Sequence, residues 1–121
     1  MKTAAQTTGR MGEAYAARCL EQAGYRILAQ NYHSRFGEID IIAESGPYIV
    51  FVEVKTRAVG CFGTPAEAVH AVKQRRLLQT AECYLLQHPS GRQPRFDVFE
   101  VYTAPDGGVT GHNHLENAFG E

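Results

Sequence analysis

The first regular pattern along the chain is helical. From Glu13 onward, small or apolar residues recur at intervals of three, four and seven positions, the spacing of one helical face: Ala16, Ala17 and Leu20. Gly24 stands where such a helix would end. The pattern predicts a helix over residues 10–23. Residues 1–9 are polar and show no period, so they predict a flexible N-terminal tail.

Three strand-like segments follow this helix. Residues 25–32 mix apolar and polar side chains and suit a strand. Residues 39–43 and 48–54 are rich in β-branched and aromatic side chains, and the turn-forming residues 45–47 separate them, so they predict a β-hairpin. Because residues 48–52 are apolar at every position and do not alternate, this strand should lie in the middle of a sheet that helices cover on both faces.

The second half of the chain predicts one more helix and one more strand. Residues 64–65 are threonine and proline, a good cap and first turn for a long helix that ends near Pro89. Residues 96–102 predict a partly exposed fourth strand, and the polar, glycine-rich residues 105–121 predict a C-terminal extension that packs on the domain or trails it. The order αβββαβ predicts an α/β fold, a three-layer α/β/α sandwich with a mixed central sheet, in a single domain over residues 10–104.

Composition narrows the functional class. The chain has 121 residues, of which 44% are hydrophobic, enough for one compact core. No apolar run approaches the roughly 18 residues that cross a bilayer, and the N-terminus lacks the apolar stretch of a secretion signal. We therefore expect a cytoplasmic protein with no membrane partner. The formal net charge of −1 argues against coating of DNA through bulk charge, so contacts with nucleic acid must come from local patches.

Candidate chemistry lies on the predicted hairpin. If its turn centres on Gly46 and Pro47, Asp40 faces Glu53 across the two strands, and strand alternation puts Lys55 on the same face. Two neighbouring carboxylates on apolar strands repel each other and lose hydration, and a divalent cation would relieve both effects. Oxygen ligands favour Mg²⁺, with Mn²⁺ as an alternative, and neither zinc nor an organic cofactor is predicted.

The same residues have a simpler interpretation. Glu53 and Lys55 could be solvated side chains on an edge strand, with Asp40 in a surface ion pair, as most charged residues are. The continuous apolar run over residues 48–52 argues against an edge strand, because an edge strand should alternate. Glu38 lies opposite Lys55 in the predicted register, so an ion pair between them is its expected role.

Other polar residues could complete the site. Glu13 shares the apolar face of the first helix and could add to the metal shell, although a glutamate in a first turn also complements the helix dipole. On the second helix, Gln74 could hold a phosphate or a water molecule, and His70 is expected to be a buried, hydrogen-bonded histidine. Five basic residues could follow a phosphate backbone, or could simply be solvated: Arg35, Arg57, Lys73, Arg75 and Arg76.

The cysteine and histidine residues give little indication of a metal site. The cysteines lie too far apart in sequence for the short spacings of a zinc ribbon, and reduced structural thiols are expected: Cys19, Cys61 and Cys83. His112 and His114 are expected to be a pair of loop histidines, because the flanking residues do not predict the strands that a zinc-dependent ββα nuclease motif requires.

Several strings of the sequence resemble the YraN-like family of uncharacterised bacterial proteins, over nearly the whole chain. The strings are residues 9–14, 35–43, 50–57, 73–77, 95–98 and 116–119. That family resembles a branch of the restriction-endonuclease-like superfamily and is similar to archaeal Holliday-junction resolvases. The resemblance implies that Asp40 and Glu53 bind magnesium and that Lys55 is the catalytic lysine. It also matches Glu13 and Gln74 to the acidic and polar positions of the superfamily.

These observations lead to three hypotheses. The first is a magnesium-dependent endonuclease that cleaves branched or damaged DNA, for which resolvase-type cutting would call for a symmetric homodimer. The second is a non-catalytic nucleic-acid-binding or DNA-repair accessory module with the same fold. The third is a purely structural hairpin with an ion pair.

Overall fold

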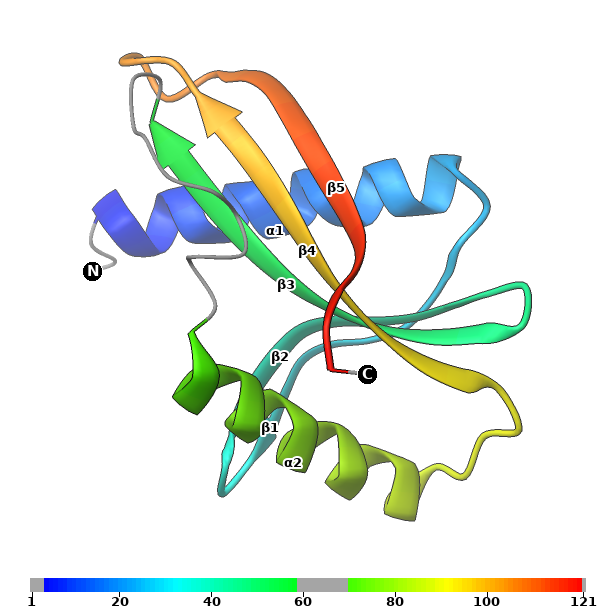
Figure 1. The fold of residues 1–121 in the computed structure, drawn as a ribbon. Coiled ribbons are helices and arrows are strands. Elements are labelled where there is room, and N and C mark those ends of the chain that lie inside the picture. Colours follow the sequence, from blue (N-terminus) through cyan, green and yellow to red (C-terminus); the bar gives the residue numbers. More distant parts are fainter. Residues whose placement is uncertain (1–3, 59–69, 121) are drawn as a thin grey trace.

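Two helices and five strands make up the described part of the protein (Figure 1). The computed structural model describes residues 4–58 and 70–120. The elements are α1 (Ala4–Gln22), β1 (Arg26–Ser34), β2 (Gly37–Ser45), β3 (Tyr48–Ala58), α2 (Ala71–Gln87), β4 (Gln93–Thr103) and β5 (Val109–Phe119). The strands form one sheet in the order β1-β2-β3-β4-β5, in which only the β3–β4 pair is parallel. The predicted α/β fold with a mixed sheet is confirmed.

Strand β3 occupies the central position that its apolar sequence predicts. Its successive residues enter two separate core clusters, because side chains alternate between the two faces of a strand. Val50 and Val52 belong to the cluster that includes Leu20 of α1, whereas Ile49 and Phe51 belong to the cluster that includes Leu77, Ala81 and Tyr84 of α2. Burial of one such side chain contributes about 1.5–3 kcal/mol, so β3 ties both helices to the sheet.

The hairpin of β2 and β3 has the predicted register. Gly46 and Pro47 form its turn, and the pairs run from Ser45–Tyr48 to Ile41–Val52. Asp40 and Glu53 are the residues that directly follow the last pair, Ile41–Val52, on the two strands.

The first helix begins earlier than predicted. It starts at Ala4 and not at residue 10, so residues 4–9 of the predicted tail belong to the helix. The sequence did not predict this extension, because its last three residues are weak helix formers that break the apolar period without preventing a helix: Thr7, Thr8 and Gly9. The second helix begins at Ala71 with His70 as its N-cap residue. The predicted start at residues 64–65 lies outside the described residues.

The C-terminal residues form a fifth strand that packs on the domain, so the predicted order αβββαβ, with four strands, is wrong. Strand β5 pairs antiparallel with β4 and turns β4 into an interior strand, which is buried along most of its length and not partly exposed as predicted. His112 and His114 therefore lie on a strand and not in a loop, and both rings pack on Phe99, with centroids 5.1 and 5.3 Å away.

Two general expectations can be compared with the described residues. Neither helix there has the length and apolar character required to cross a membrane. Cys19 and Cys83 are free, half-buried thiols, as expected, and Cys61 lies outside the described residues.

Gly12 marks a close contact between α1 and β3. A Cβ atom at this position would lie 2.2 Å from Oγ1 of Thr56. We therefore expect Gly12→Ala to lower the free energy of unfolding by about 1–3 kcal/mol, although Gly→Ala in a helix ordinarily stabilises a protein by up to about 1 kcal/mol. Urea denaturation would measure the change.

A second substitution and a control sharpen this prediction. Thr56→Ala in the Gly12→Ala background removes the clashing oxygen and should restore most of the lost stability. Gly91→Ala is the matched control, because no atom lies within 4 Å of a Cβ there. If Gly12→Ala were as stable as Gly91→Ala, the close packing of α1 on β3 would be contradicted.

Candidate active site

Strands β2 and β3 separate just where the predicted acidic residues begin (Figure 1). Their pairing ends at Ile41 and Val52. Beyond that point the Oδ2 atom of Asp40 accepts a hydrogen bond of 2.8 Å from the backbone N–H of Val54. A side-chain carboxylate thus takes the place of a backbone acceptor, and this bond fixes Asp40 at the point of divergence.

Glu53 is the buried carboxylate of the pair. Its exposed fraction is 6%. Its Oε1 atom lies 2.5 Å from Nζ of Lys73 and 3.5 Å from Nζ of Lys55. The predicted neighbourhood of Glu53 and Lys55 is therefore present, but it contains a second lysine from α2.

Sequence reasoning missed the position of Lys73 at the site and assigned it only to a basic surface. One signal was available: Lys73 precedes the buried Leu77 by four residues, so both point from the same side of the helix. The helix that packs Leu77 into the core thereby brings the Lys73 ammonium group to the sheet.

The electrostatics of the site are dominated by its crowded carboxylates. Burial raises the pKa of Asp40 to about 8, with further contributions from the negative charges of Glu53, Glu13 and Glu38, while the N–H of Val54 opposes the shift. In the absence of a cation, Asp40 therefore holds a proton at neutral pH. Burial and the neighbouring Lys73 ammonium lower the pKa of Lys55. A lysine with a lowered pKa is better suited to accept a proton from water.

Asn31 joins two further carboxylates near the site. With its amide nitrogen turned towards them, it donates hydrogen bonds to Oε1 of Glu38 at 2.9 Å and to Oε1 of Glu13 at 2.8 Å. Its φ of 54° lies in the left-handed region, which asparagine tolerates better than most residues. Glu13 is half-buried, and burial together with Glu38 raises its pKa. The structure thus places Glu13 close to the site, where its carboxylate accepts a hydrogen bond from the Asn31 amide.

The expected ion pair between Glu38 and Lys55 is not formed. Glu38 contacts His33 at 3.6 Å and Asn31, whereas Lys55 contacts Glu53. The pairing of β2 with β3 ends before it reaches these two residues, so the cross-strand geometry that predicted their contact does not extend to them.

The carboxylates of Asp40 and Glu53 are suitable ligands for a divalent cation. Within residues 4–58 and 70–120, no three Asp, Glu, His or Cys side chains converge as ligands for a metal ion. Mg²⁺ needs only one or two carboxylates, since water and substrate phosphate complete its octahedral shell. Asp40 and Glu53 provide two, and a cation would offset both the burial and the repulsion from Glu53 that raise the pKa of Asp40.

Among the other predicted residues, Gln74 is half-buried in the first turn of α2, next to Lys73. His70 is exposed at the helix N-cap, whereas it was predicted to be buried.

The predicted basic residues are only partly available to a ligand. Arg57 forms an ion pair with the buried Glu100, so its guanidinium group is engaged within the protein. Three of the five basic residues are exposed: Arg35, Arg75 and Arg76.

The titration of Asp40 gives a prediction for the metal-free protein. Its folded pKa lies above its unfolded value of 3.8, so the stability that it contributes is complete below pH 3.8 and is lost as the pH rises through about 8. Asp40→Asn removes this titration and keeps an oxygen that can accept the bond from Val54. We expect the variant in EDTA to be more stable than the wild type above pH 8, by about 1 kcal/mol or more.

Thermal unfolding between pH 6 and pH 9 in EDTA would measure this difference. The gap between variant and wild type should shrink towards pH 6. The matched control is Glu82→Gln, an exposed carboxylate on α2. Equal melting temperatures of Asp40→Asn and wild type across the whole range would contradict a raised pKa at Asp40.

Comparison with known proteins adds a family relationship. The uncharacterised protein family UPF0102 matches residues 12–101. A UPF0102 protein of Symbiobacterium thermophilum is 52% identical over 112 residues, which cover 92% of this chain and 94% of the relative. A UPF0102 protein of Alkaliphilus oremlandii is 48% identical, with 92% of this chain and 96% of the relative covered. The name of neither relative states an activity.

Proposed function

Because the chain belongs to the uncharacterised protein family UPF0102, whose name states no activity, we propose its function from the site itself. It is a magnesium-dependent nuclease that hydrolyses phosphodiester bonds of branched or damaged DNA. One observation carries this proposal: a buried glutamate and a carboxylate with a raised pKa lie beside two lysines where two strands diverge.

The fold supports the same proposal. A mixed sheet whose central strand enters two core clusters, one with each helix, is compatible with the α/β/α sandwich of restriction-endonuclease-like proteins. In that class an aspartate and a Glu-x-Lys sequence on neighbouring strands form the catalytic centre, and Asp40, Glu53 and Lys55 occupy neighbouring strands here.

Each site residue has a defined task in this mechanism. Asp40, once deprotonated, and Glu53 would hold the cation. When bound, Mg²⁺ supplies charge that polarises the phosphodiester and lowers the pKa of water. Lys55, with its lowered pKa, orients the attacking water and accepts its proton. Lys73, a flexible ammonium group beside Glu53 at the mouth of the site, would contact a phosphate oxygen of the substrate.

A binding module without catalysis is the second candidate. The observation in its favour is that Glu53 is already neutralised by Lys73 at 2.5 Å. In that case Lys55 and Lys73 serve only to neutralise Glu53, and the exposed arginines alone bind DNA.

The two candidates differ in a cleavage assay. Labelled four-way junction, flap, single-stranded and blunt duplex DNA would be incubated with the full chain in Mg²⁺, Mn²⁺ or EDTA. The nuclease proposal predicts products only with a divalent cation, and faster cleavage of branched DNA than of blunt duplex. Binding without any product in either metal would favour the second candidate.

A further inference from the structure

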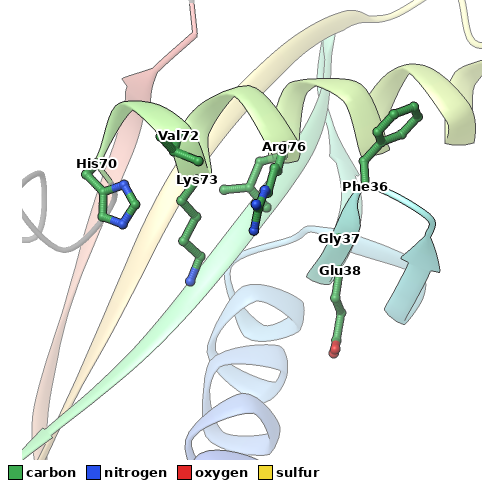
Figure 2. Close-up of a pocket in the computed structure, with 8 residues that line it drawn as sticks. Phe36, Gly37, Glu38, His70, Val72, Lys73 and Arg76 are labelled. Atoms are coloured by element: carbon green, nitrogen blue, oxygen red, sulfur yellow. The ribbon is translucent and has the colours of Figure 1, made fainter.

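A groove runs between α2 and the turn that joins β1 to β2. It consists of two adjoining pockets, of about 260 and 550 Å³, that share Phe36, Gly37, Glu38 and Arg76. The smaller pocket also takes in Lys73, so the groove leads directly to the residue that contacts Glu53. Figure 2 shows the side chains of His70, Lys73 and Arg76 extending from the same side of α2.

Three partly buried hydrogen bonds hold one wall of the groove in place. Oγ of Ser34 accepts a bond of 3.0 Å from the N–H of Phe36 and lies 2.9 Å from Oγ1 of Thr80. Thr80 is fully buried and donates in turn to the carbonyl oxygen of Arg76 at 2.8 Å. The turn that carries Phe36 is thus fastened to α2, and the pocket exists before any ligand binds.

The lining of the smaller pocket combines apolar surface with positive charge. Phe36, Leu77 and the 49%-exposed Val72 provide the apolar part. Lys73 and Arg76 provide cations. Val72 belongs to neither core cluster. A pocket that bound only a phosphate would not need apolar residues in its lining.

Apolar or aromatic surface beside cations is the combination that binds single-stranded nucleic acid, where bases stack and phosphates meet positive charge. Arg35 extends this surface, because its Cζ atom lies 4.8 Å from the centroid of the Phe36 ring. Among the described residues that line the two pockets, only Glu38 carries a carboxylate. It already contacts His33 and Asn31.

We propose that this pocket binds one unpaired nucleotide of the DNA substrate, with its base against Phe36 and Val72 and its phosphates at Lys73 and Arg76. The inference rests on the proposed function and deepens it. Since Lys73 also contacts Glu53, the unpaired nucleotide lies next to the bond that is cut. The substrate class is therefore DNA in which an unpaired nucleotide borders a duplex, such as a flap or a branch point.

The test measures binding in EDTA, so that its outcome does not depend on cleavage. Fluorescence anisotropy would compare a duplex carrying one unpaired 2-aminopurine nucleotide with a fully paired duplex of equal length. We expect the full chain to bind the first about tenfold more tightly, and the 2-aminopurine fluorescence to change on binding. Phe36→Ala and Arg76→Ala should each reduce this preference to within about twofold.

Two controls separate the possible results. Leu86→Ser, at an apolar residue that is 83% exposed on α2 outside the groove, should keep the preference. An abasic site at the unpaired position should lose it, because the base is missing while the phosphates remain. Equal binding of abasic and 2-aminopurine DNA, or a preference that survives in both pocket variants, would overturn the proposal. Absence of cleavage alone would count against the proposed function and not against this pocket.

Discussion

Replacing Glu53 by glutamine is expected to lower the cleavage rate by about 10²–10³-fold or more, while the chain remains folded. Glutamine keeps the shape of the side chain but removes the charge that would hold the cation together with Asp40. Lys55→Met should cause a loss of about 10²–10⁴-fold, the range for removal of a group that transfers a proton. Single-turnover cleavage of the best branched substrate, at saturating enzyme, measures both losses without a contribution from binding.

The control for these variants is Glu82→Gln, which changes the same net charge on an exposed part of α2. It should cleave at the wild-type rate. Circular dichroism must show that Glu53→Gln is folded, because that substitution also removes the partner of Lys73. Cleavage by Glu53→Gln or Lys55→Met at the rate of Glu82→Gln would contradict their catalytic roles.

Asp97→Ala is expected to cause the largest loss of stability, about 3–5 kcal/mol in the free energy of unfolding. The fully buried carboxylate accepts hydrogen bonds of 3.0 and 2.9 Å from Arg95 and of 2.9 Å from the N–H of Asn117, and lies 2.7 Å from Nε2 of His114. Its removal leaves the guanidinium group of Arg95 without its main counter-charge and removes the contacts of Asp97 with His114 and Asn117 of β5. Urea denaturation measures the effect, and Glu82→Ala is the surface control.

The pH dependence of this contribution has a definite sign. Burial alone would raise the pKa of Asp97, but the hydrogen bonds from His114, Arg95 and Asn117 outweigh it and lower the pKa. The stabilisation is therefore present above the unfolded pKa of 3.8 and is lost as the pH falls through the lower folded value. A loss at neutral pH no greater than that of Glu82→Ala would show that the network contributes little.

The hairpin could be predicted in detail because its determinants are local. A Gly46–Pro47 turn between two β-branched runs fixes the register, which ends at Ile41–Val52, so Asp40 and Glu53 are the next residues along the two strands. The uninterrupted apolar run in β3 likewise indicated the central position of that strand, since only a strand covered on both faces needs such a sequence.

Features that depend on distant packing could not be predicted. Lys73 reaches Glu53 only because α2 crosses the sheet at that place. Strand β5 has a polar sequence, and it is ordered by pairing with β4 and by the buried contact of His114 with Asp97. For the same reason the sequence did not predict the burial of Asp97, which lies in a strand that was expected to be partly exposed.

A titration of Mn²⁺ is the most direct test of a cation shared by Asp40 and Glu53. Calorimetry at pH 8, near the pKa of Asp40, would be combined with thermal unfolding of the wild type and Asp40→Asn. We expect the wild type to bind one ion per chain, with release of a proton and a higher melting temperature. Asp40→Asn should show neither effect. Absence of binding by the wild type, or the same affinity in Asp40→Asn, would contradict a metal site at these two carboxylates.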